Sequence, residues 1–273
     1  MSRLERALEN ALEQRNLATP GATALLQPPP DRLRDKPVRP PSNSRHVTVK
    51  PSGLLLATAM APNSIAAEEF RKVKERIMTQ TDSRLTRNIF MVTSALPGEG
   101  KSMASLNLAI SLAQEFDHTV LLIDADLRSP SCAKYLGLEC HVGLSECLGQ
   151  GLNVSEALLS TNIGKLKFLP AGTPPLNPVE LFSSNRMKVL MDEIKHRYPD
   201  RFVIIDTPPV LPYAETRIIA GMADGVFMVL RAGSTTLEQA MECLGSLPVK
   251  SVLGLIFNGS TEAKHADYGY SYR

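Results

Sequence analysis

Six short apolar runs recur along the chain, and the segments between them carry apolar residues at helical spacing. The runs are apolar on both faces, which is typical of strands in a parallel sheet that helices cover on either side. Alternating strands and helices predict an α/β domain with a doubly wound, mostly parallel sheet, and such sheets bind ligands at the carboxyl ends of their strands. Strands are expected at residues 89–93, 119–123, 166–169, 202–205, 226–230 and 252–257, and helices at 64–78, 103–114, 179–196, 213–222 and 237–244.

The two ends of the chain depart from this pattern. Residues 1–17 place their leucines on one stripe among charged residues, which predicts a short amphipathic helix. Proline and basic residues dominate 18–50, so we expect a disordered or extended linker there. The folded domain is expected at 51–262 and a flexible tyrosine tail at 263–273. The N-terminal helix is either a tether for a partner or a vestigial tail.

Composition places the chain among ordinary globular proteins. Its 273 residues are 43% hydrophobic and 21% charged, with a formal net charge of +2. This charge gives no electrostatic reason to expect nucleic acid as a partner, and no apolar run approaches the roughly 20 residues that cross a bilayer. The first residues lack the apolar core of a signal peptide, so a cytoplasmic location is expected. The four cysteines have no metal-site spacing and are expected to be reduced, mostly structural thiols.

The strongest chemical signal is a glycine-bearing loop between an apolar strand and a helix. Residues 94–102 read Ser-Ala-Leu-Pro-Gly-Glu-Gly-Lys-Ser, a phosphate-binding loop in the strand–loop–helix context that it requires. Backbone N–H groups would surround phosphate oxygens, Lys101 would reach the β- and γ-phosphates, and Ser102 would contact Mg²⁺. One departure is Ala95, which stands where the common pattern has glycine. The flanking strand and helix disfavour a chance Gly-Lys-Ser after a turn.

Three aspartates end two of the apolar runs. Asp124 and Asp126 lie two residues apart and are therefore expected to share a face, and Asp206 closes a second run. An acid at the tip of an apolar strand beside a phosphate loop positions Mg²⁺ directly or through water. Capping of the next helix is the alternative for any single aspartate. Three aspartates at two strand ends favour the metal and nucleophile roles.

Three segments resemble the Walker A, A′ and B motifs of the bacterial tyrosine kinases that regulate capsule and exopolysaccharide export. They are residues 94–102, 121–128 (Leu-Leu-Ile-Asp-Ala-Asp-Leu-Arg) and 203–209 (Val-Ile-Ile-Asp-Thr-Pro-Pro). The likeness extends over roughly residues 52–273, and Asp-x-Asp-x-Arg is its most specific part. It implies a P-loop NTPase of the MinD/ParA-like group. It also implies an autokinase that uses ATP and Mg²⁺ to phosphorylate C-terminal tyrosines in trans.

The resemblance further implies a role for each matching residue. Asp124 is expected to accept the proton of the incoming tyrosine, a phenol of pKa about 10. Arg128 either stabilises phosphate charge or pairs with an aspartate. The expected catalytic residues are Lys101, Asp124, Asp126 and Arg128, the nucleotide-binding residues Pro97, Gly98, Glu99, Gly100, Lys101, Ser102 and Met103, the metal ligands Ser102, Asp126 and Asp206, and the phosphoacceptors Tyr268, Tyr270 and Tyr272.

Partners are implied in the same way. Glu68, Arg71 and Lys74 match a ring-forming Glu-x-x-Arg-x-x-Arg segment, with Lys74 in place of the last arginine. A homo-oligomer is therefore expected, and a ring is one arrangement that it could take. Ordinary ion pairs along a solvated helix would also explain this face. The family implies a separate membrane adaptor of the chain-length-determinant type, whose cytoplasmic tail activates the kinase and holds it at the inner membrane. It also implies a protein-tyrosine phosphatase as a partner.

Two other functions compete with the kinase. The ATPases of cell-division-site selection and plasmid partition are related, but their loop carries an extra lysine where this chain has Leu96. A scaffold that binds nucleotide and oligomerises without kinase activity is the second alternative. The missing lysine and the tyrosine tail favour the kinase.

Overall fold

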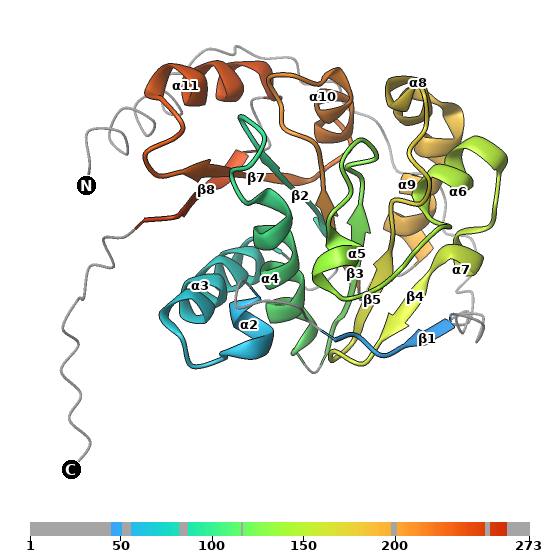
Figure 1. Ribbon diagram of the computed structural model, residues 1–273, viewed down its shortest axis with the longest axis horizontal. Coiled ribbons are helices and arrows are strands. Elements are labelled where there is room, and N and C mark those ends of the chain that lie inside the picture. The colour runs from blue at the N-terminus through green and yellow to red at the C-terminus, as the bar shows by residue number, and fades with distance from the viewer. Residues whose placement is uncertain are drawn as a thin grey trace, which may run out of the picture.

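An eight-stranded sheet forms the centre of the structure, with strand order β1-β4-β5-β3-β6-β2-β7-β8 (Figure 1). The computed structural model describes residues 45–50, 56–81, 87–115, 117–197, 201–248 and 252–260. Neighbouring strands are parallel except for β4 and β5, so the predicted mostly parallel sheet is confirmed. The strands are β1 (Arg45–Val47), β2 (Ile89–Ser94), β3 (Thr119–Asp124), β4 (Leu159–Thr161), β5 (Leu166–Leu169), β6 (Arg201–Asp206), β7 (Gly225–Arg231) and β8 (Val252–Asn258).

Helices cover both faces of the sheet, and an apolar layer lies under each set (Figure 1). Successive residues of a strand point to opposite faces, so Phe90 and Val92 of β2 enter one layer while Ile89 and Met91 enter the other. Burial on both faces is the reason why these strands are continuously apolar. One face carries α2 (Ala57–Met60), α3 (Ile65–Gln80), α4 (Lys101–Ala113) and α5 (Cys132–Tyr135); the other carries α6 (Leu144–Gln150), α7 (Val154–Ala157), α8 (Pro178–Ser183), α9 (Asn185–Arg197), α10 (Ala214–Ala220) and α11 (Leu237–Ser246).

The single helix predicted at 179–196 is two helices, α8 and α9, so that prediction was wrong. Ser184 between them is extended, with φ −67° and ψ 156°. Its hydroxyl donates to the Leu181 carbonyl at 2.7 Å and accepts the Met187 N–H at 3.2 Å. A serine that bonds to nearby backbone groups in this way competes with the helical hydrogen bonds and ends the helix.

Residues 45–50 fall inside the predicted linker at 18–50, and the boundary of that prediction was wrong. β1 pairs with β4, and Val49 is buried with its N–H donating to Asn162 Oδ1 at 2.8 Å. Strands of three residues carry too few positions for a periodic signal, which is why β1 and β4 were not predicted.

Several predictions on the ends of the chain lie outside the described residues. These are the helix at 1–17, the linker up to residue 44, and the tail at 263–273. Within the part of the chain that the structure describes, no helix has the length and apolar character that crossing a membrane requires.

Truncation of the N-terminus distinguishes the linker from β1. Removing residues 1–43 is expected to leave the melting temperature nearly unchanged, whereas removing 1–50 deletes β1 and the buried Val49. Burying a valine contributes about 1.5–3 kcal/mol, and 1 kcal/mol shifts the melting temperature of a domain of this size by about 2–4 °C. Thermal denaturation followed by circular dichroism measures both. An equal loss of stability in the shorter truncation would show that residues 1–43 pack on the domain.

Candidate active site

The loop between β2 and α4 turns around two glycines in the left-handed conformation. Gly98 has φ +80° and Gly100 has φ +93°, a region that glycine enters without steric cost. A Cβ on Gly98 would meet nothing within 4 Å, so the backbone there faces open space. At Gly100 a Cβ would lie 2.1 Å from Asn258 Nδ2. Ala95, which replaces the usual glycine, is buried in the core, where its methyl group packs.

Three residues from β7, β8 and the start of α11 hold this loop from the side. Asn258 Nδ2 donates to the Glu99 carbonyl at 2.8 Å, and Arg231 donates to the Gly98 carbonyl at 3.0 Å. The Glu99 carboxylate accepts the Leu96 N–H at 2.7 Å and the Thr235 hydroxyl. Sequence reasoning missed these contacts. Arg231 and Asn258 do end apolar runs at the carboxyl edge, which is the signal that located the aspartates.

Lys101 begins α4 and points at the A′ segment. Its Nζ lies 2.7 Å from Asp126 Oδ2, and the two side chains are 12% and 3% exposed. Burial works against the charged Lys101, but Asp206 and Asp126 outweigh it and raise the pKa of the ammonium group. The Asp126 carboxylate also accepts the Ser129 N–H at 3.0 Å. Asp126 is therefore bound to Lys101 in this structure, at the side of the site that faces the loop.

Asp124 and Asp206 lie opposite each other at the tips of the adjacent strands β3 and β6. Both are fully buried. Burial raises the pKa of Asp124 well above its usual range, and the charge of Asp206 raises it further. Hydrogen bonds from the N–H groups of Cys132 at 3.1 Å and Asp126 at 3.2 Å lower this pKa and so oppose the shift. Burial also raises the pKa of Asp206, opposed by Lys101 and by hydrogen bonds from Ser102 and Ser105. Two buried carboxyl groups side by side cannot both ionise unless more positive charge is present.

This donor set fits a hard divalent cation. Carboxylate and hydroxyl oxygens are the ligands that Mg²⁺ prefers, and Asp206 brings its carboxylate to the Ser102 hydroxyl at the start of α4. Asp124 faces the same buried space through its contact with Asp206. A cation there would relieve the repulsion that raises the pKa of both acids.

A thiol completes the cluster, and no local sequence pattern predicts it. Cys132 is the first residue of α5, and its Sγ lies 3.4 Å from Asp206 Oδ2. Burial and then Asp206 raise the pKa of this thiol well above its usual range. All four cysteines are free, as predicted. Burial raises the pKa of Cys147 to about 11 and that of Cys243 to about 12, which keeps these two core thiols protonated.

Arg128 pairs with a carboxylate, but not with an aspartate. Its Nε donates to Glu215 on α10, and its guanidinium carbon lies 4.7 Å from the centre of the Tyr213 ring. The hydrogen bond to Glu215 raises the pKa of Arg128. The ion-pair partner of Arg128 is thus Glu215 and not an aspartate, while the expected role of Arg128 toward phosphate stays a prediction. The residue instead ties the A′ segment to α10, a contact across 87 positions that no local pattern reveals.

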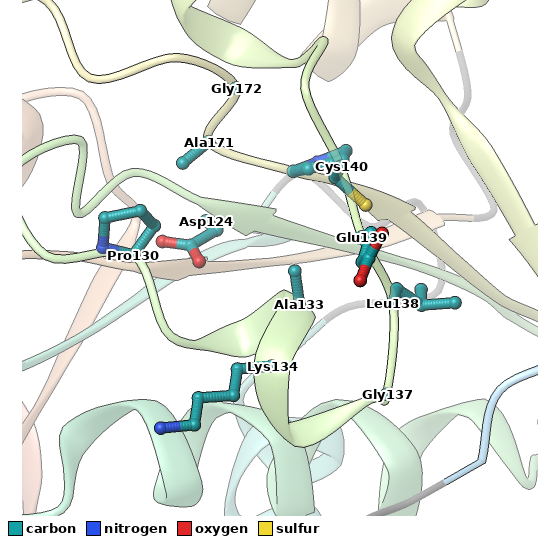
Figure 2. Close-up of a pocket in the computed structure, with 11 residues that line it drawn as sticks. Asp124, Pro130, Ala133, Lys134, Gly137, Leu138, Glu139, Cys140, Ala171 and Gly172 are labelled. Carbon is teal, nitrogen blue, oxygen red and sulfur yellow. The ribbon is translucent and has the colours of Figure 1, made fainter.

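An open cavity of about 440 Å³ lies next to Asp124. Figure 2 shows the Asp124 carboxylate among Pro130, Ala133 and Ala171, which line this cavity with it. Glu146 holds two wall segments together, because its carboxylate accepts the N–H groups of Gly143 at 2.7 Å and Thr173 at 3.1 Å. The cavity therefore reaches the neighbourhood of Asp124, whose own side chain is fully buried.

The predicted oligomer contacts lie on α3, away from this cavity. Glu68 and Arg71 form an exposed ion pair within the helix, and Lys74 pairs with Glu115 at the end of α4. The ion pairs that the solvated-helix alternative expects are therefore present. The predicted phosphoacceptors Tyr268, Tyr270 and Tyr272 lie outside the described residues.

Comparisons with known proteins place the chain among kinases. Residues 88–246 match the family model described as an AAA domain. The tyrosine-protein kinase YwqD of Bacillus subtilis is 39% identical over 77% of this chain and 87% of its own length. The putative tyrosine-protein kinase EpsB of Ralstonia solanacearum is 32% identical over 84% of this chain, which spans only 30% of that relative.

Solved structures agree with these sequence matches. The kinase domain of the Escherichia coli tyrosine kinase ETK aligns with a TM-score of 0.70 at 26% identity, over 88% of this chain and 89% of that domain. The septum site-determining protein MinD of Pyrococcus horikoshii, at 20% identity and a TM-score of 0.51 over 64% of this chain and 72% of its own, shares the fold. The predicted MinD/ParA-like fold is thereby confirmed.

Replacing Asp206 by asparagine is expected to stabilise the metal-free protein at pH 8. The folded pKa of Asp206 lies above the unfolded value of 3.8, so the folded state loses stability as pH rises above that value. The variant's advantage should therefore be largest at pH 8 and shrink toward pH 4. An amide can keep the Ser105 hydrogen bond. Thermal melts in chelator measure the effect.

Asp192→Asn on the exposed face of α9 is the control, because the loss of one exposed charge should change the melting temperature little at any pH. A lower melting temperature for Asp206→Asn than for wild type at every pH would contradict the argument.

Asn258→Ala is expected to weaken ATP binding, because it removes the hydrogen bond to the Glu99 carbonyl. A hydrogen bond of this kind contributes about 0.5–1.5 kcal/mol, so the dissociation constant should rise roughly 2–10-fold. Asn162→Ala removes a similar bond to backbone, from Val49 at the far edge of the sheet, and is the matched control. Calorimetric titration with Mg·ATP separates the two. Equal affinities would exclude Asn258 as a residue that positions the loop.

Proposed function

Because the chain belongs to the bacterial tyrosine-protein kinases, we propose that it transfers the γ-phosphate of ATP to C-terminal tyrosines of a neighbouring copy. We propose further that this autophosphorylation regulates the synthesis or export of an exopolysaccharide. The relatives named as kinases favour this function over a nucleotide switch or an inactive scaffold.

One observation carries the proposal: Asp124 lies between the phosphate-binding loop and an open cavity. On one side it is in contact with Asp206, which receives the Ser102 and Ser105 hydrogen bonds from α4. On the other side it lines the 440 Å³ cavity. Phosphoryl transfer needs a donor and an acceptor held in line, and the position of Asp124 beside both Asp206 and the cavity supports a role for it in that transfer.

The residues of the loop would bind the phosphates of ATP. The backbone N–H groups of 98–103, in the loop and the first turn of α4, would supply donors, and the start of α4 would add the positive end of the helix dipole. Lys101 would exchange part of its contact with Asp126 for the β- and γ-phosphates. Ser102 and Asp206, with Asp126 or Asp124, would hold Mg²⁺, which supplies neutralisation of the charge on the transferring phosphate. Asn258, Arg231 and the Glu99–Thr235 contact keep the loop in shape.

Asp124 is the proposed proton acceptor for the tyrosine hydroxyl. Its place at the wall of the cavity, where an incoming hydroxyl group would approach, supports this role. Arg128 does not need to touch phosphate in this scheme, because its bond to Glu215 orients the segment that carries both aspartates. Asp124→Asn should therefore slow transfer more than it weakens Mg·ATP binding.

The oligomer and the partners complete the proposal. Glu68 and Arg71 are exposed on α3 and are offered as contacts between copies, with Lys74 as a third that already pairs with Glu115. Each phosphate adds about −1.5 to −2 charge, so phosphorylated tails repel one another and loosen the assembly. A separate membrane adaptor of the chain-length-determinant type would recruit and activate the kinase on the cytoplasmic side of the inner membrane. A protein-tyrosine phosphatase would reset it.

Mixing two defective chains tests transfer between copies. One chain carries Lys101→Met and an intact tail, and the other is active but ends at residue 262. After incubation with Mg·ATP, mass spectrometry is expected to find phosphate on Tyr268, Tyr270 or Tyr272 of the Lys101→Met chain. Light scattering should show smaller particles as phosphate accumulates.

Each chain alone is the control and should remain unlabelled on these tyrosines. Lys101→Met leaves the buried Asp126 without its partner, and breaking a buried ion pair costs about 3–5 kcal/mol of stability. Because this variant could therefore unfold, a chain with Asp124→Asn serves as a second inactive acceptor. Phosphate only on Tyr135 or Tyr198 would exclude the tail as the substrate. No transfer by the wild-type chain would exclude autokinase activity.

A further inference from the structure

We propose that Asp124, Cys132 and Asp206 form a binding site for a thiophilic divalent cation such as Zn²⁺, which competes with the Mg²⁺ of the kinase reaction. The three side chains each offer one ligand atom, and these atoms lie within 4.8 Å of one another. Cation binding to the nucleotide-free chain is a separate property from kinase activity, so either can fail without the other.

The distances suit a small four-coordinate ion. Zn²⁺ binds thiolate sulfur at about 2.3 Å and carboxylate oxygen at about 2.0–2.2 Å in tetrahedral geometry. A sulfur and an oxygen on one such ion are then about 3.5 Å apart. The observed separation of Cys132 Sγ and Asp206 Oδ2 is 3.4 Å. In the ion-free protein this separation is that of a hydrogen bond from the thiol to the carboxylate, and an ion that replaced the thiol proton would need little movement of the pair.

Three separate elements fix the ligands before any ion arrives. Asp124 ends β3, Asp206 ends β6, and Cys132 opens α5. The Cys132 N–H donates to one Asp124 oxygen, and the Ser105 hydroxyl donates to one Asp206 oxygen. Each of these ligands is fully buried. Hydrogen bonds of this kind orient ligands and raise the affinity of a metal site.

The sulfur atom decides which ion the cluster prefers. Mg²⁺ requires oxygen ligands in near-octahedral geometry, whereas Zn²⁺ and Cd²⁺ accept thiolate. The Cys132 thiol releases its proton to the solvent buffer as the metal–sulfur bond forms. Lys101 sits beside the cluster but already pairs with Asp126, so a divalent cation would balance two of the three negative charges of the two carboxylates and the thiolate. Asp124 also lines the cavity, which is therefore the side from which an ion would approach these buried ligands (Figure 2).

Binding at this cluster would inhibit the kinase. The ion would occupy the carboxylates that the reaction needs, Asp124 as the proton acceptor and Asp206 as a Mg²⁺ ligand. Zn²⁺ would therefore act as a competitor of Mg²⁺, and the competition would depend on the thiol of Cys132.

Cd²⁺ titration of the full chain without nucleotide tests the site directly, because a cadmium–thiolate bond absorbs in the ultraviolet. The wild type is expected to show this absorption at one equivalent of Cd²⁺. Cys132→Ser should lose it, and its affinity for Zn²⁺, measured against a chromophoric chelator, should fall by at least about tenfold, since even outer-shell changes cost about 10–100-fold. Cys140→Ser, which removes the thiol that lines the cavity, is the matched control and should keep both.

Two outcomes overturn the proposal. One is cadmium–thiolate absorption that survives in Cys132→Ser or disappears in Cys140→Ser. The other, independent of any variant, is an X-ray absorption spectrum of the zinc-loaded wild type without a sulfur ligand at about 2.3 Å. Inhibition of the kinase gives a functional readout. At fixed Mg²⁺, we measure the Zn²⁺ concentration that halves the labelling rate of each protein relative to its own uninhibited rate. This concentration should rise at least about tenfold in Cys132→Ser.

Discussion

Two carboxyl groups without access to water lie side by side at the tips of β3 and β6, and the surrounding structure is arranged to tolerate them. Removing an ionised carboxylate from water costs several kcal/mol even after relaxation. Backbone N–H groups of the A′ segment, hydroxyls of α4 and the ammonium of Lys101 offset part of this cost. The offset is incomplete, because both carboxyl pKa values remain raised. A cation that binds there stabilises the folded state in proportion to its affinity, so the site trades stability of the free protein for ligand binding.

The shape of the phosphate-binding loop depends on the ends of β7 and β8, the two strands that follow β2 toward one edge of the sheet. Asn258 and Arg231 end β8 and β7, and both donate to carbonyls of the loop. Gly100 has room for no side chain because Asn258 occupies the space beside it. Asn258 is also the last residue of β8, and the predicted tyrosine tail begins only a few residues later. The tail that is proposed to receive phosphate therefore follows closely after Asn258, and Asn258 shapes the loop that is proposed to bind ATP.

The sequence predicts the parts of the fold that repeat and misses those that depend on single contacts. Inner strands such as β2 and β6 are predicted because burial on both faces makes them continuously apolar. The edge strand β8 is also predicted from its apolar run, although it is only half-buried. β1 and β4 are too short for that signal, and the break between α8 and α9 rests on one hydroxyl, that of Ser184. The aspartates were found because the carboxyl ends of parallel strands meet at one edge. Cys132 and Glu215 were missed because only tertiary structure brings them to Asp206 and Arg128.

The two aspartates of the A′ segment lie two residues apart, yet the structure gives them different surroundings. β3 ends at Asp124, so the alternation that would place both on one face stops there. Beyond it, the Asp126 carboxylate accepts the Ser129 N–H and turns to Lys101, while Asp124 accepts the Cys132 N–H and borders the cavity. The bond from Arg128 to Glu215 anchors the segment in which both turns occur. Asp126 is thus paired with the lysine of the phosphate-binding loop, whereas Asp124 lines the cavity.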